Sequence, residues 1–122
     1  MPPEARDAAR LYDMLESARA AIEYCQDRQR EDLEHNRMLA DAVVRRIEVI
    51  GEAARGLSEG LQAAHPEVPW RAIMAIRHII VHEYDRIDFN IVWRIVREHL
   101  PPLIQQLEMI LAQMPPPPVS EG

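Results

Sequence analysis

A chain of 122 residues is long enough for one domain with its own hydrophobic core. Apolar residues make up 48% of it and charged residues 28%, as in globular proteins, and no apolar run approaches the ~20 residues of a membrane-spanning helix. The single cysteine, Cys25, excludes an intrachain disulfide, and the N-terminus lacks the apolar stretch of a signal peptide, so we expect a cytoplasmic protein. The net charge of −6 argues against a surface built wholly for nucleic-acid binding, although a local site among the 14 arginines remains open.

Periodic apolar residues predict two long helices in the first half of the chain. They cover residues 5–25 and 32–59, and the polar residues 26–31 between them form a connector. The apolar stripes are Leu11, Leu15, Ala18, Ile22 and Cys25 in the first helix, and Leu39, Val43, Ile47, Ile50, Ala54 and Leu57 in the second. Gly51 lies inside the second helix, where glycine costs about 1 kcal/mol of helix propensity. It either allows another helix to approach closely or is simply tolerated.

The next stretch predicts a loop followed by a short third helix. Residues 60–69 contain one glycine and two prolines and predict the loop. The third helix begins directly after Pro69 and continues to about Ile80. Residues 84–88 (Tyr-Asp-Arg-Ile-Asp) break its pattern, and Asp88 is a suitable N-cap for another helix.

The fourth predicted helix carries an apolar stripe from Trp93 to Met114. The stripe keeps its phase across Pro101 and Pro102, so we expect a kinked but continuous helix there, since proline removes one backbone hydrogen bond. The fold class is therefore all-α, an antiparallel four-helix bundle over residues 1–114. The proline-rich residues 115–122 predict a disordered tail.

Arg77 and His82 have the chemistry needed to cut RNA without a metal. Histidine titrates near neutrality and can take the proton from a ribose 2′-OH, while arginine can stabilise the charge on the phosphoryl oxygens. Five residues correspond to about 500° of rotation, so on a straight helix the two side chains point roughly 140° apart. They converge only if the helix ends or loosens near His82. By spacing alone, a solvated face or a capping role is the other interpretation.

Several landmarks in the same order carry a family resemblance. They are IGEAA at 50–54, HPEVPW at 65–70, the Arg77-x4-His82-x-Tyr84 element, IVW at 91–93 and LPPL at 100–103. With these segments the chain resembles the HepT-like branch of the HEPN superfamily over residues 8–113.

The resemblance implies a fold, an activity and a means of control. It implies a homodimeric helical bundle whose Arg-x4-His motif is a metal-independent endoribonuclease site in a cleft at the dimer interface, with no cofactor. Arg77 and His82 would be the catalytic pair, acting on RNA. The partner would be a minimal nucleotidyltransferase antitoxin, which silences the toxin by transferring AMP to the motif tyrosine, Tyr84. An added nucleotide would place bulk and phosphate charge beside His82.

Two further positions, His78 and Glu52, are candidate supporting residues. Family members often carry a small polar residue after the arginine, where this chain has His78. Glu52 lies within the IGEAA landmark and could support the site, although it and Glu48 are more typical of a solvated or arginine-paired face.

Two other functions are compatible with the same residues. His78 and His82 are spaced i, i+4 as in a helical zinc pair, although a third ligand is not evident. A non-catalytic helical module that binds a nucleotide or a protein is the alternative from a different class. The intact Arg77, His82 and Tyr84 argue for the ribonuclease.

Overall fold

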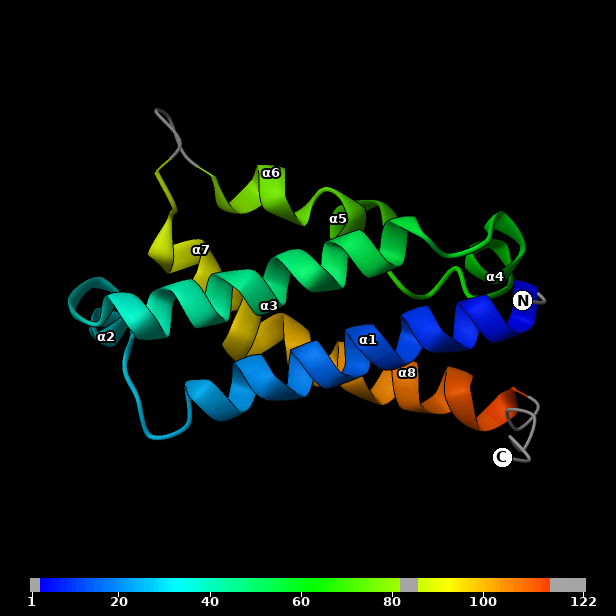
Figure 1. Ribbon diagram of the computed structural model, residues 1–122, viewed down its shortest axis with the longest axis horizontal. Coiled ribbons are helices and arrows are strands. Elements are labelled where there is room, and N and C mark those ends of the chain that lie inside the picture. The colour runs from blue at the N-terminus through cyan, green and yellow to red at the C-terminus, as the bar shows by residue number, and fades with distance from the viewer. Residues whose placement is uncertain (1–2, 82–85, 115–122) are drawn as a thin grey trace, which may run out of the picture.

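The computed structural model describes residues 3–81 and 86–114, and all the regular structure there is helical apart from an isolated bridge between Val81 and Ile87. The elements are α1 (Pro3–Tyr24), α2 (Arg30–His35), α3 (Arg37–Arg55), α4 (Glu59–Ala64), α5 (Trp70–Met74), α6 (Ile76–Ile80), α7 (Phe89–Arg94), a π-helical turn (Ile95–His99) and α8 (Leu100–Gln113). The predicted all-α fold is confirmed. Figure 1 shows that the successive segments α1, α3, α5–α6 and α7–α8 alternate in direction.

The core lies where α1 packs against α3 and α8. Most of the predicted stripe residues are buried there, and Ile22 and Leu39 are partly buried at its edge. Burying each leucine or isoleucine side chain stabilises the fold by about 1.5–3 kcal/mol. Cys25 is fully buried in this core, which raises the pKa of its thiol, while Arg97 and Arg28 oppose the rise. It serves as a small apolar residue, as its stripe position predicted.

The prediction of one helix over residues 32–59 is wrong at both ends. The chain breaks at Asn36, whose side chain accepts a hydrogen bond from the Leu39 N–H at 3.1 Å and so caps α3. Asparagine competes in this way for backbone donors, which favours a new N-terminus over a continuous helix. At the other end, α3 stops at Arg55, with Gly56 as its C-cap.

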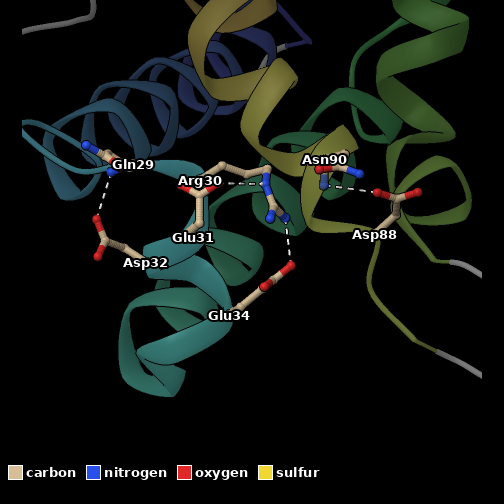
Figure 2. Close-up of polar contacts among 7 residues, drawn as sticks. All are labelled: Gln29, Arg30, Glu31, Asp32, Glu34, Asp88 and Asn90. Carbon is tan, nitrogen blue, oxygen red and sulfur yellow. Dashed lines mark hydrogen bonds and ion pairs between the residues drawn. The ribbon is translucent and has the colours of Figure 1, made fainter.

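Side-chain hydrogen bonds cap the N-termini of α2 and α7, which pack against each other. Figure 2 shows the Gln29 N–H donating to Asp32 at 2.7 Å at the start of α2, and the Asn90 N–H donating to Asp88 at 3.0 Å at the start of α7. Asp88 also accepts from the Ile91 N–H at 3.2 Å. The predicted N-cap role of Asp88 is therefore confirmed.

The prediction of a loop over residues 60–69 is wrong in its first half, which contains all but the first residue of a short helix, α4 (Glu59–Ala64). Ser58 caps it by accepting from the Leu61 N–H at 3.2 Å. The buried Asp7 carboxylate on α1 accepts from the Ser58 hydroxyl at 2.6 Å and from its N–H at 2.9 Å. This three-residue network ties α4 to the start of α1, a long-range contact that turn residues alone could not reveal.

The predicted third helix is divided, and the fourth contains an irregular turn. A non-helical residue, Ala75, separates α5 from α6. The path from Phe89 to Gln113 is continuous as expected, but a π-helical turn precedes Pro101, and the Leu100 N–H donates to the Ile95 carbonyl five residues back. The wider turn suits a proline whose ring would crowd the carbonyl four residues before it. None of the described helices has the length and apolar character needed to cross a membrane. The predicted tail, 115–122, lies outside the described residues.

Candidate functional site

Arg77 lies on α6, a single short helix held by its apolar residues. Ile76 and Ile80 are buried, whereas Arg77, His78 and Ile79 between them are exposed. A helix of five residues is not stable by itself, so its position depends on the contacts of its buried side. The exposed side of α6 therefore presents Arg77 and His78 at the surface.

The helix that carries Arg77 ends just before His82. Ile80 is the last residue of α6, and Val81 is extended and forms an antiparallel bridge with Ile87. The Asp88 N–H donates to the Ile80 carbonyl at 2.8 Å, which joins the two flanks of the motif. The predicted end of the helix near His82 is thus confirmed. His82 and Tyr84 themselves lie outside the described residues.

The Arg77 guanidinium faces a carboxylate on α3. Its Nε lies 3.6 Å from Oε2 of Glu48, and the side chains are 75% and 25% exposed, respectively. Glu52, one turn further along α3, lies 3.1 Å from an Arg45 nitrogen instead. The prediction of an arginine-paired face for Glu48 and Glu52 is confirmed, and the structure brings Glu48, rather than Glu52, to the motif arginine.

The chain of α5 and α6 approaches α3 closely at Gly51. A Cβ atom on this residue would lie 2.8 Å from Cγ2 of Ile76 and 3.1 Å from the Ile73 carbonyl oxygen. One helical turn later, Arg55 donates from Nε to the Met74 carbonyl at 3.0 Å, next to the break between α5 and α6. Of the two interpretations of Gly51, the close approach is the one observed.

The other histidines take no common position. His78, His35 and His99 are exposed, and His78 has no hydrogen bond or ion pair with the residues that the structure describes. The His65 side chain is only 20% exposed, and its backbone carbonyl accepts a hydrogen bond from the indole N–H of the buried Trp70 at 2.9 Å. Within residues 3–81 and 86–114, no three His, Cys, Asp or Glu side chains form a metal-binding group.

An apolar groove of about 450 Å³ opens beside the motif helix. It lies between α5 and α6 on one side and α7, the π-helical turn and α8 on the other. Its polar lining residues include Arg94, His99 and Gln106. Its apolar walls include Ile73, Ile76, Ile79, Ile91, Ile95 and Leu103. Sequence periodicity did not indicate this surface groove, since an apolar stripe does not tell which part of it stays uncovered.

The family model of the HepT-like ribonucleases matches residues 14–110. The chain belongs to the HepT-like ribonuclease family. It is 37% identical over 100 residues to a Methanocaldococcus jannaschii protein named "Putative RNase MJ1380", covering 82% of this chain and 92% of the relative. It is 32% identical over 102 residues to the "Probable ribonuclease HepT" of Thermococcus cleftensis, covering 80% and 93%. No solved structure matches the chain significantly.

Membership in this family confirms the resemblance drawn from the landmarks and supports a ribonuclease function. The matched region contains α3, the motif helix and the apolar groove. The sequence alone missed the pairing of Arg77 with Glu48. A signal was present, because Glu48, Gly51 and Arg55 are spaced three and four residues apart and so share one face of α3.

Proposed function

We propose that this protein is a metal-independent endoribonuclease toxin in which Arg77 and His82 form the catalytic pair. The observation that supports it best is the exposed Arg77 guanidinium on a helix that ends just before His82, in a chain of the HepT-like ribonuclease family. Because α6 ends at Ile80, the 140° separation expected on a straight helix does not apply to the pair. A cytoplasmic location accords with RNA as the substrate.

The proposed reaction is an internal transesterification of RNA. His82 takes the proton from a ribose 2′-OH, and that oxygen bonds to the adjacent phosphorus. The bond from phosphorus to the 5′-oxygen breaks, giving a 2′,3′-cyclic phosphate, and the departing oxygen takes up a proton. Arg77 stabilises the charge that gathers on the phosphoryl oxygens, for which its guanidinium fork is suited. His78 and Glu52 remain candidate supporting residues.

Cleavage of a synthetic RNA in EDTA tests this function. We expect the wild-type chain to cleave, and Arg77→Ala and His82→Ala to lose about 100-fold or more of the rate. Arg19→Ala and His35→Ala, at exposed positions on α1 and α2, are matched controls that should retain activity. A requirement for a divalent metal would contradict the mechanism and favour the His78–His82 zinc pair. RNA binding without cleavage would favour the non-catalytic binding module.

We further propose that a nucleotidyltransferase antitoxin controls the toxin through Tyr84. The tyrosine oxygen would bond to the α-phosphorus of ATP as pyrophosphate leaves, so that the side chain carries AMP and its phosphate charge. The negative charge beside the motif would repel RNA. Intact mass of the chain co-expressed with a nucleotidyltransferase encoded by a neighbouring gene should rise by whole AMP residues, and Tyr84→Phe should abolish the rise. An unchanged mass, or a label that persists in Tyr84→Phe, would refute this assignment.

We also propose that the protein is a homodimer. The apolar groove lies beside Arg77 along the motif helix, and Ile79, which lines it, is exposed on the same helix. A second copy covering the groove would bring two motif helices to one interface.

A further inference from the structure

One face of α3 makes three different kinds of contact with α5 and α6. Glu48 reaches the Arg77 guanidinium, Gly51 allows the backbone of α5 to approach, and Arg55 holds the Met74 carbonyl beside the helix break. These α3 residues follow at intervals of three and four, so they form one line along the helix. Because α6 is too short to be stable alone, it depends on packing of its buried residues, and this line of contacts runs beside that packing and ends at its arginine.

The contact between Glu48 and Arg77 leaves most of the guanidinium accessible. The closest approach is from Nε, at 3.6 Å, and three quarters of the arginine side chain is exposed. A guanidinium has five N–H groups in a planar fork, more than one carboxylate can accept. The pair can therefore restrict the rotation of the arginine while N–H groups remain free for a phosphate.

The neighbouring carboxylate is engaged elsewhere. Glu52 pairs with Arg45 on the solvent side of α3, so within the part of the chain that the structure describes, Glu48 is the acidic residue at ion-pair distance from Arg77. Glu48 is also the less exposed member of its pair, at 25%, and packing restricts its own side chain more than that of Arg77. Of the two, Glu48 is the fixed group and Arg77 the one that it orients.

Building on the proposed ribonuclease function, we propose that Glu48 is a positioning residue that orients the Arg77 guanidinium toward the scissile phosphate. A phosphate in the ground state tolerates several orientations of an arginine, whereas the transition state requires donors aimed at the oxygens where charge develops. Glu48 therefore acts mainly on kcat. Its negative charge beside an anionic substrate opposes RNA binding, so its removal does not raise KM.

The test compares Glu48→Gln and Glu48→Ala with the wild-type chain in a steady-state RNA cleavage assay. Glutamine keeps the size and one hydrogen-bond acceptor but not the charge, and alanine removes the contact. We expect kcat to fall about tenfold in Glu48→Gln and up to about a hundredfold in Glu48→Ala, with KM unchanged or lower. Both variants should melt close to the wild-type temperature, since an ion pair to an arginine that is 75% exposed contributes little to stability.

Glu108→Gln is the matched control, because it removes a comparable arginine pair between α1 and α8, with 3.3 Å between Arg19 and Glu108. It should leave kcat and KM unchanged. A Glu48→Gln enzyme with wild-type kcat, or one that differs in KM alone, would overturn the positioning role while Arg77→Ala still tests the ribonuclease function. A loss of kcat shared equally by Glu108→Gln would also overturn it. A wild-type chain that cuts no RNA would instead overturn the ribonuclease function itself.

Discussion

At the residue scale, Gly51 sets the distance between α3 and the helix pair α5–α6. Alanine at this position would place its Cβ 2.8 Å from Ile76 Cγ2, where the β-branched side chain is buried and cannot easily move away. Overpacking of this kind costs about 1–3 kcal/mol, and alanine regains at most about 1 kcal/mol of helix propensity. We predict that Gly51→Ala lowers the free energy of unfolding by about 1 kcal/mol, measured as a lower urea midpoint.

Gly60 offers the matched control for this prediction. It lies in α4, and a Cβ built there meets no other atom within 4 Å. Gly60→Ala should leave the urea midpoint unchanged or raise it, because only the propensity gain remains. If Gly51→Ala were as stable as Gly60→Ala, the close approach of the two helices would not limit the size of residue 51.

The sequence alone predicted the roles of some residues but not the contacts of others. Asp88 was predictable as an N-cap because a cap is a local device that acts on N–H groups two and three residues away. Arg77 was identified by its motif. Its contact with Glu48 spans 29 positions of the chain, and many exposed carboxylates could have served, so only the packing of α6 on α3 selects the partner.

At the scale of elements, apolar periodicity predicted which segments are helical but not where each one is interrupted. The stripes of α1 and α3 were correct because core burial selects the same face over many turns. The interruptions at Asn36 and Ala75 leave the apolar pattern intact on both sides, so periodicity does not reveal them. The end of α6 before His82 was predictable because polar residues replace the pattern there. That end is the one that matters for the site.

At the scale of the whole molecule, the proposed dimer concerns the apolar groove beside the motif. The groove measures about 450 Å³, and Ile79 on its wall is 42% exposed. Isoleucine walls of this extent are better covered than solvated, since each apolar square ångström removed from water contributes roughly 25 cal/mol. The residue next to Ile79 along α6 is His78, followed by Arg77, so a partner over the groove would border the motif.

Replacing Ile79 with a charged residue tests this arrangement directly. A glutamate there would bury an unpaired charge in the interface, which costs several kcal/mol, so we predict that Ile79→Glu converts a dimer into a monomer. Sedimentation equilibrium or light scattering gives the mass, which does not depend on whether the substitution also disturbs the motif. Met109→Glu is the control, because Met109 is 64% exposed on α8 and does not line the groove. It should keep the dimer mass. Dimers persisting in Ile79→Glu, or a monomeric wild-type chain, would place the groove outside any interface between copies.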